Sequence, residues 1–332
     1  MNLPQTMTLI EITQPGGPEV LQPRQAPVPT AGAGEVLIRV HAAGVNRPDV
    51  IQRSGKYPMK PGMSPIPGLE VAGEVVAIGA GVTDFILGDK VCALTNGGGY
   101  AQYCVAPAGQ TLPIPEGMDW VQAAAVPETF FTVWANLFDM GGASKGQRAL
   151  IHGGTSGIGT TALMLCREFG VKAFATAGSE DKCAAIRKLG AEAINYRDQD
   201  FVQVIQEKTA GKGVNVILDI MGGSYLNPNI AALGMEGRLV MLGFLGGAHA
   251  KDVDLLAIMS KRAIITGSLL RPRTPEEKAS IAEQLREYVW PVLAAGRCLP
   301  MIDQVFSLTD AAQAHARMEA GDHIGKIVLR VD

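Results

Sequence analysis

A glycine-rich turn near the middle of this 332-residue chain limits its fold more than any other feature. Residues 151–159 read I-H-G-G-T-S-G-I-G. They follow a short apolar stretch at 148–152 and lead into residues 158–169, whose apolar side chains recur with the period of a helix. Such a strand–turn–helix lets the backbone approach a pyrophosphate, whose charge the helix N-terminus favours. We therefore expect a dinucleotide to bind at this turn.

The residues of the turn expected to contact the cofactor are Gly154, Ser156, Gly157, Ile158 and Gly159. Compared with the pattern G-x-G-x-x-G, Ser156 replaces the middle glycine, and its side chain is small enough for the turn to survive. A Walker-type phosphate loop is excluded, because no Gly-Lys-Ser or Gly-Lys-Thr sequence closes the turn.

Strand and helix patterns alternate around this turn, from about residue 126 to residue 267. After the turn we expect strands at 172–177, 214–220, 237–243 and 263–267, and a helix at 181–189. Strands that alternate with helices predict a parallel, doubly wound sheet. Residues 126–267 are therefore interpreted as a Rossmann domain.

The two ends of the chain have a different pattern. Up to about residue 125, Gly and Pro separate short predicted strands at 34–41, 68–79 and 89–93. From residue 268 onward we expect a helix at 275–295 and a terminal strand at 325–331, which would rejoin the first domain. The prediction is an α/β protein whose second domain is β-rich and consists of residues 1–125 and 268–332.

The end of the second Rossmann strand indicates which dinucleotide is bound. An enzyme that uses NAD places Asp or Glu about 20 residues after the turn, where the carboxylate binds the ribose 2′-hydroxyl. Here residues 176–179 read T-A-G-S, without a carboxylate. Ser179 and the positive charge of Lys182 suit the 2′-phosphate of NADPH, and Arg197 beside Tyr196 could add a second cation.

Composition and charge exclude several classes of protein. The 29 Lys and Arg residues nearly balance the 32 Asp and Glu residues, which gives no general attraction to nucleic acid or anionic membranes. No apolar stretch is long enough to span a bilayer, and the N-terminus lacks the pattern of a signal peptide. The five cysteines form no Cys-x-x-Cys pair, which argues against disulfides or a tetrathiolate zinc site and favours a reduced, cytoplasmic location.

Short motifs are spread over nearly the whole chain. They read A-G-V-N-R-P-D-V-I-Q-R-S-G at 43–55, I-P-G-L-E-V-A-G at 66–73, G-D-K-V at 88–91, A-A-A-V-P-E-T-F-F-T at 123–132 and G-K-I-V-L at 325–329. With a dinucleotide turn in mid-chain, their order resembles that of the medium-chain dehydrogenases/reductases. The resemblance implies that the β-rich domain is a GroES-like catalytic domain.

Zinc-dependent alcohol dehydrogenases of that superfamily carry a cysteine near Asn46 and a Gly-His-Glu near Gly68, where this chain reads Gly68-Leu69-Glu70. They also carry four closely spaced cysteines, which this sequence lacks. The chain therefore resembles the zinc-independent quinone oxidoreductases, the zeta-crystallin-like branch, and no metal is expected. The resemblance implies an NADPH:quinone oxidoreductase, in which NADPH C4 gives a hydride to a quinone.

The resemblance also implies which residues form the site. Asn46 and Tyr57 match positions that line the cleft beside the nicotinamide, and Thr132 matches a position near the nicotinamide end. Positions that hold the 2′-phosphate, or that cover the nicotinamide and its ribose, match Gly178, Lys182, Tyr196, Met221, Gly243, Phe244, Ser268 and Leu269. We expect Tyr57 and Asn46 to position the acceptor and donate hydrogen bonds to it, with no obligatory acid or base.

Alternatives to this function are open at this point. An enone or alkenal reductase would use the same NADPH hydride on a conjugated carbonyl compound, and an NADPH-binding sensor or structural protein would have no turnover. A short-chain dehydrogenase shares the spacing of Gly153, Gly157 and Gly159 but needs a Tyr-x-x-x-Lys sequence, which this chain lacks. Family members commonly form homodimers by pairing edge strands, and the apolar stretch at 263–269 would suit that role.

Overall fold

A computed structural model describes residues 3–61 and 63–331. The chain divides into two compact units, one of Met1–Phe131 with Arg273–Asp332 and one of Thr132–Pro272. It is a mixed α/β protein, as the sequence predicted, and its parallel sheet is confined to the unit that holds the glycine turn. Among the described residues, no helix is long and apolar enough to cross a membrane.

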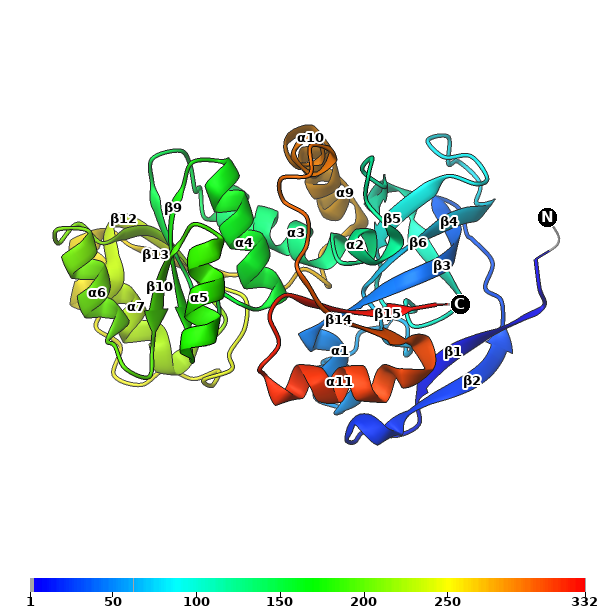
Figure 1. Ribbon diagram of the computed structural model, residues 1–332, viewed down its shortest axis with the longest axis horizontal. Coiled ribbons are helices and arrows are strands. Elements are labelled where there is room, and N and C mark those ends of the chain that lie inside the picture. The colour runs from blue at the N-terminus through cyan, green and yellow to red at the C-terminus, as the bar shows by residue number, and fades with distance from the viewer. Residues whose placement is uncertain (1–2, 62, 332) are drawn as a thin grey trace. The chain divides into compact units, whose positions relative to one another are not determined.

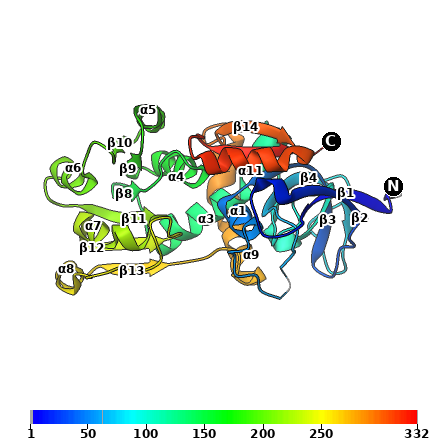
Figure 2. The ribbon, with the colours of Figure 1, turned by 90° about the horizontal axis from the view of Figure 1, so that it is seen from below.

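The unit of residues 132–272 is built on a six-stranded sheet. Its strands are β8 (Arg148–Ile151), β9 (Lys172–Ala177), β10 (Glu192–Asn195), β11 (Val214–Asp219), β12 (Leu233–Met241) and β13 (Ile264–Gly267). They lie in the order β10-β9-β8-β11-β12-β13 (Figure 2), and every neighbouring pair is parallel. Because the order runs both ways from β8, this is the doubly wound sheet of a Rossmann domain.

Helices cover both faces of this sheet (Figure 1). On one face lie α4 (Gly157–Glu168) and α5 (Glu180–Lys188), and on the other α6 (Phe201–Lys208), α7 (Leu226–Ala232) and α8 (Leu255–Lys261). A π-helical stretch at Trp134–Met140 and a 3-10 turn at Gly223–Tyr225 complete the unit. Leu150, Ile194, Ile217 and Leu239 are completely buried in its core.

The other unit contains both ends of the chain. A hairpin pairs β1 (Thr6–Ile12) with β2 (Leu21–Pro27), and a larger sheet runs β14-β15-β3-β4-β5-β7, with β6 also paired to β3. The strands of the larger sheet are β3 (Glu35–Val45), β4 (Glu70–Ile78), β5 (Lys90–Leu94), β6 (Tyr103–Pro107), β7 (Thr111–Pro113), β14 (Ile302–Ser307) and β15 (Lys326–Arg330). The terminal strand β15 pairs antiparallel with β3 (Figure 1), which confirms that it rejoins the first domain.

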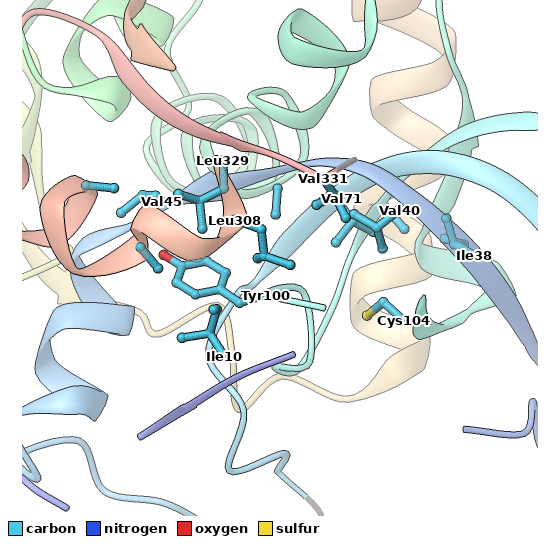
Figure 3. Packing of buried hydrophobic residues seen from close by; sticks show 14 of the residues in the cluster. Ile10, Ile38, Val40, Val45, Val71, Tyr100, Cys104, Leu308, Leu329 and Val331 are labelled. Carbon is cyan, nitrogen blue, oxygen red and sulfur yellow. The ribbon is translucent and has the colours of Figure 1, made fainter. Parts of the chain in front are cut away.

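Short helices pack around these strands. They are α1 (Arg47–Arg53), α2 (Trp120–Ala124), α3 (Pro127–Val133), α9 (Pro275–Gln284), α10 (Trp290–Ala294) and α11 (Ala311–Ala320), with 3-10 turns at Pro18–Val20, Ala108–Gln110 and Leu308–Asp310. Figure 3 shows the core of this unit, where the Tyr100 ring lies between Ile10 and Leu308. The core therefore joins the N-terminal hairpin to the C-terminal segment.

The helix predicted at 275–295 forms, with a π-helical turn inside it. Helix α9 ends at Gln284, Leu285–Val289 are π-helical, and α10 continues to Ala294 with no non-helical residue between them. Pro291 lacks the N–H of a regular α-helical bond, which accounts for the irregular hydrogen bonding in the turn before it. The sequence analysis did not predict α11, whose residues AAQAHARMEA are mostly alanine and polar and so carry a weak apolar periodicity.

Two ion pairs tie C-terminal elements to the rest of this unit. Lys326 of β15 places its ammonium 2.6 Å from Oε1 of Glu70 in β4 and also donates to the Val45 carbonyl at 3.1 Å. Both charged side chains of this pair are almost fully buried. Arg53 of α1 forms two hydrogen bonds, of 2.9 and 2.8 Å, with the Glu319 carboxylate of α11. The pair in the sheet is thus shielded from water, whereas in the second pair Arg53 is buried and the Glu319 side chain is 37% exposed.

Replacing Lys326 with methionine should lower the free energy of unfolding by about 3–5 kcal/mol, because Glu70 would keep a buried charge without its partner. Urea denaturation followed by circular dichroism would measure the loss. Lys208→Met is the matched control, since it removes an exposed pair with Glu192 and should cost about 1 kcal/mol or less. Equal losses in the two variants would contradict this role of the buried pair.

Candidate active site

The glycine turn leaves β8 and enters α4 through Ser156. Gly153 has a φ of +71°, which a residue with a side chain rarely adopts. Ser156 is the N-cap of α4, since its Oγ accepts the Gly159 N–H at 3.0 Å, and the same hydroxyl donates to the Gly153 carbonyl at 2.8 Å. The N–H groups of Gly157 and Ile158 open the helix, where no intrahelical partner reaches them.

The turn has no room for side chains at two of its glycines. A Cβ on Gly159 would lie 2.3 Å from the Gly153 carbonyl oxygen, and one on Gly154 would lie 2.6 Å from the Ala175 Cβ. Both distances are too short for real Cβ atoms, so α4 packs against the turn and β9 only because these residues are glycines. The exposed side of the turn is therefore mostly backbone, which suits close approach of a phosphate.

His152, next to the glycine turn, is buried and held in place by hydrogen bonds. His152 contacts the Asn229 Oδ1 through Nε2 at 2.7 Å and the Thr176 Oγ1 through Nδ1 at 3.1 Å, and Thr176 also accepts the Gly153 N–H. Burial lowers the pKa of His152 to about 4, so its ring is neutral at pH 7 and can donate from one nitrogen while accepting at the other. The sequence analysis assigned no part to His152.

The residues predicted to hold the 2′-phosphate come together at the ends of β9 and β10. A Cβ on Gly178 would lie 2.4 Å from the Tyr196 hydroxyl, so only glycine lets that ring lie there. Ser179 caps α5, and its Oγ accepts the Lys182 N–H at 3.4 Å. The nearby Glu180 carboxylate forms an ion pair with Arg187 at 2.6 Å. This pair lowers the pKa of Glu180 and balances its negative charge.

A second group of predicted residues follows the strands on the other side of β8. Met221 comes after β11, Gly243 and Phe244 after β12, and Ser268 and Leu269 after β13. Because all six strands are parallel, these residues lie at the same edge of the sheet as the glycine turn. The side chains of Phe244 and Leu269 are more than half exposed.

Asp219 and Asn136, which the sequence analysis did not identify, hold the loops at this edge of the sheet in place. Buried Asp219 ends β11 and accepts the N–H groups of Met221 at 2.7 Å and Gly222 at 3.0 Å. Burial raises the pKa of Asp219, and these two N–H groups oppose that rise. The only sequence signal for Asp219 is a carboxylate at the end of an apolar strand.

The second missed residue is Asn136, which links two predicted positions. Its Nδ2 donates to the Thr132 carbonyl at 2.7 Å, and its Oδ1 accepts from the Ser268 hydroxyl at 2.7 Å. Asn136 itself is almost fully buried. The structure therefore brings Thr132 and Ser268 together through one amide, although 136 residues of sequence separate them.

In the other unit, Asn46 lies in a buried polar cluster rather than in an open loop. Its Nδ2 donates to the Glu70 Oε1 at 2.8 Å, and its Oδ1 accepts from the Lys326 ammonium at 2.5 Å. Its backbone N–H donates to Asp49 at 2.9 Å, and Asp49 also accepts the Gly68 N–H. The orientation of the Asn46 amide is thus fixed, and its polar atoms are engaged within the protein.

Tyr57, the other predicted catalytic residue, is partly exposed in the loop that follows α1. Around Asn46, the side chains of Glu70 and Asp49 are acidic and that of Lys326 is basic. Among the residues that the structure describes, no group of three or more His, Cys, Asp or Glu side chains is arranged to hold a metal ion.

Known proteins resemble this chain over nearly its whole length. The descriptions "Alcohol dehydrogenase GroES-like domain" and "Zinc-binding dehydrogenase" match residues 32–116 and 189–329. The quinone oxidoreductase of Rattus norvegicus is 33% identical over 327 residues, and that of Homo sapiens is 32% identical over 327 residues. Each alignment covers 97% of this chain and 97% of the relative.

Solved structures agree with these relatives. A mycobacterial quinone oxidoreductase superposes with a TM-score of 0.85 at 30% identity, over 98% of this chain and 99% of that one. A mycobacterial protein in complex with NADPH gives 0.86 at 30% identity, and an NAD-dependent alcohol dehydrogenase 0.86 at 29%; each match covers 98% of this chain and 100% of the other. With a GroES-like and a Rossmann-like domain, this chain belongs to the medium-chain dehydrogenase/reductase family and is an oxidoreductase.

Proposed function

We propose that this protein is an NADPH-dependent quinone oxidoreductase that works without a metal ion. The observation that carries the proposal is the corner at the ends of β9 and β10, where Ser179, Lys182 and Tyr196 stand and strand β9 ends without a carboxylate. The relatives named quinone oxidoreductases and the structural neighbour that binds NADPH support the same substrate class and cofactor.

The residues of the Rossmann unit fit NADPH. The open N–H groups of Gly157 and Ile158 suit the pyrophosphate, and the missing side chains of Gly154 and Gly159 allow its approach. Ser179, Lys182 and Tyr196 would hold the 2′-phosphate together with Gly178. On the nicotinamide side the proposed residues are Thr132, Met221, Gly243, Phe244, Ser268 and Leu269.

NADPH, when bound, supplies a hydride to the acceptor. The protein has to orient the acceptor, exclude water and stabilise the negative charge that grows on an acceptor oxygen. Tyr57 can donate its hydroxyl proton in a hydrogen bond to that oxygen. Since Glu70 and Lys326 hold the Asn46 amide, Asn46 orients the acceptor mainly through its fixed position. Exposed Phe244 and Leu269 offer apolar surface to flat rings.

A paired titration with NADPH and NADH, followed by addition of 9,10-phenanthrenequinone, tests the proposal. We expect NADPH to bind more tightly than NADH and to be oxidised when the quinone is added. Tighter binding of NADH would contradict the cofactor assignment. Turnover of an alkenal in place of any quinone would identify an enone reductase, and NADPH binding without turnover of either acceptor would identify a sensor.

Lys182→Ala should raise the Kd for NADPH about tenfold, which corresponds to about 1.4 kcal/mol, and leave the Kd for NADH unchanged. The reason is that NADH lacks the 2′-phosphate that the ammonium would bind. Fluorescence titration of both cofactors measures the two constants. Lys188→Ala is the control, because Lys188 is an exposed lysine near the far end of the same helix. Equal weakening of NADH binding would argue against the assignment.

Tyr57→Phe should lower kcat/KM for a quinone by about tenfold or less, near 1.4 kcal/mol, because one hydrogen bond to the growing charge is lost while solvent can still protonate the product. Steady-state kinetics at saturating NADPH measure the effect. A loss of several thousandfold would mean that Tyr57 is an obligatory proton donor, against this mechanism.

We also propose a cytoplasmic homodimer. All five cysteines are buried, and none of them forms a disulfide in the described part of the chain, which fits a reducing compartment. Strand β13 forms one edge of the parallel sheet, and its Ile264 is exposed. The preceding helix α8 exposes Leu255, Leu256 and Met259, each by more than three-fifths. An apolar sheet edge of this kind needs a cover, and two-fold pairing with a second copy is the commonest solution.

Ile264→Lys should convert the dimer into a monomer of 35.0 kDa, because two buried lysines would face each other across the paired edges. Light scattering at micromolar concentration reports the mass. Ile86→Lys introduces the same change at an exposed loop position of the other unit and should leave the mass unaltered. A wild-type protein that is already monomeric would refute the proposed assembly.

A further inference from the structure

Thr176, near the end of β9, binds two consecutive residues of the glycine turn. Its hydroxyl oxygen accepts the Gly153 N–H at 3.3 Å, and its carbonyl oxygen accepts the Gly154 N–H at 2.9 Å. The Gly153 carbonyl in turn accepts the Ser156 N–H at 3.0 Å and the Ser156 hydroxyl at 2.8 Å. Because Ser156 is the N-cap of α4, the bonds from Thr176 help to set where that helix begins.

The hydrogen bonds of His152 fix the direction of the Thr176 hydroxyl. The His152 Nε2 lies 2.7 Å from the Asn229 Oδ1, an oxygen that can only accept, so Nε2 carries the ring proton. In the neutral ring Nδ1 is then an acceptor, and it lies 3.1 Å from the Thr176 Oγ1. Thr176 therefore donates its hydroxyl proton to His152 and keeps its oxygen as an acceptor for the Gly153 N–H.

The opposite tautomer would fit these contacts less well. A proton on Nδ1 would place two donors, the ring and the Gly153 N–H, against the Thr176 oxygen. Among the residues that the structure describes, the Thr176 hydroxyl proton would then have no bonded acceptor. A buried hydroxyl without an acceptor destabilises the fold, which favours the proton on Nε2.

The side chains in this series of hydrogen bonds are shielded from water. Thr176, His152 and Asn229 are each 2% exposed or less. The His152 ring also lies edge to face with the rings of Phe201 and Tyr225, and both centroid distances are 5.0 Å. Since water does not reach these groups, it cannot replace a hydrogen bond that a substitution removes.

We propose that Thr176 and His152 position the glycine turn for the pyrophosphate of the cofactor, an inference that rests on the proposed function because it requires a dinucleotide at this turn. Neither side chain touches the cofactor in this role, because both are buried. They act through Gly153, whose carbonyl binds the N-cap of α4 and so sets the open N–H groups at the start of the helix. The pyrophosphate is common to NADPH and NADH, so the role predicts an effect on both cofactors.

Thr176→Val removes the hydroxyl and keeps the shape of the side chain. We expect the Kd for NADPH and the Kd for NADH each to rise about tenfold, because the Gly153 N–H loses a partner and the turn is held less firmly. Thr176→Ser keeps the hydroxyl and should bind both cofactors as the wild type does. Fluorescence titration measures all of these constants.

Thr209→Val is the matched control. The buried Thr209 hydroxyl also accepts a glycine N–H, that of Gly213 at 2.9 Å, and donates to the Ile205 carbonyl at 2.7 Å. Thr209 precedes the start of β11, whereas the glycine turn follows the end of β8, so the two lie at opposite edges of the parallel sheet. Thr209→Val should lower the Tm as Thr176→Val does, but leave both Kd values unchanged. An equal rise of the Kd values in the control would reduce the effect to one of stability and refute the role.

NMR of wild-type protein labelled with 15N in its histidines tests the hydrogen bonds without any cofactor or substitution in Thr176. We expect His152 to be neutral at pH 7 with its proton on Nε2. His152→Phe identifies the signal by its loss. A proton on Nδ1 would reverse the bond to Thr176 and overturn the assignment.

The outcomes separate this inference from the proposed function. If the wild type binds NADPH and Thr176→Val leaves both Kd values unchanged, the positioning role is refuted and the proposed function stands. Weaker binding of NADPH alone would place the effect at the 2′-phosphate and would also refute the role. Tighter binding of NADH by the wild type would overturn only the choice of cofactor, since the role predicts the same rise in Kd for either one. If the wild type binds neither, the proposed function fails and the positioning role fails with it.

Discussion

The β-rich unit depends on the buried carboxylate of Glu70. Its Oε1 accepts hydrogen bonds from Asn46 and Lys326, and its Oε2 accepts the N–H of Glu128. Residue 44 has to be glycine, because a Cβ there would lie 2.0 Å from the same Oε1. A buried charge is tolerated only with such partners, and here they come from three separate segments of the chain. The hydrogen bonds that Glu70 accepts therefore join these segments and also fix the position of the Asn46 side chain.

In the Rossmann unit the limiting factor is the lack of room for side chains at three glycines, and not a buried charge. Gly154, Gly159 and Gly178 are placed where a Cβ would collide with neighbouring atoms, so the surface at the ends of β8 and β9 consists of backbone and a few small side chains. The buried groups beneath it, His152 and Asp219, use their hydrogen bonds to hold the neighbouring loops and not to reach outward. The N–H groups of Gly157 and Ile158 open this edge, which is an arrangement that favours anion binding.

The sequence predicts features that are encoded by neighbouring residues better than features that depend on contacts between distant residues. The glycine turn, the strand β9 and the helix α5 are encoded within a few residues, and they form within one or two residues of their predicted positions. The four-residue strand β10 fully buries only Ile194 and gave no periodic signal. The partners of Asn46 lie 24 and 280 residues away, and no local pattern connects them. The sequence analysis expected the Asn46 amide to donate a hydrogen bond to the acceptor and did not foresee these partners, because that amide is engaged only once β4 and β15 are assembled.

The same cluster limits how much negative charge the β-rich unit has to bury. Lys326 neutralises Glu70 through direct contact, and the backbone N–H of Glu128 is a further partner of the same carboxylate. Burial, and next the charge of Glu70, raise the pKa of Glu128 to about 8, so this acid holds its proton in most molecules at neutral pH. A second ionised carboxylate beside Glu70 would need a compensating partner of its own, because an unpaired charge is costly to remove from water. Keeping the proton on Glu128 avoids that cost.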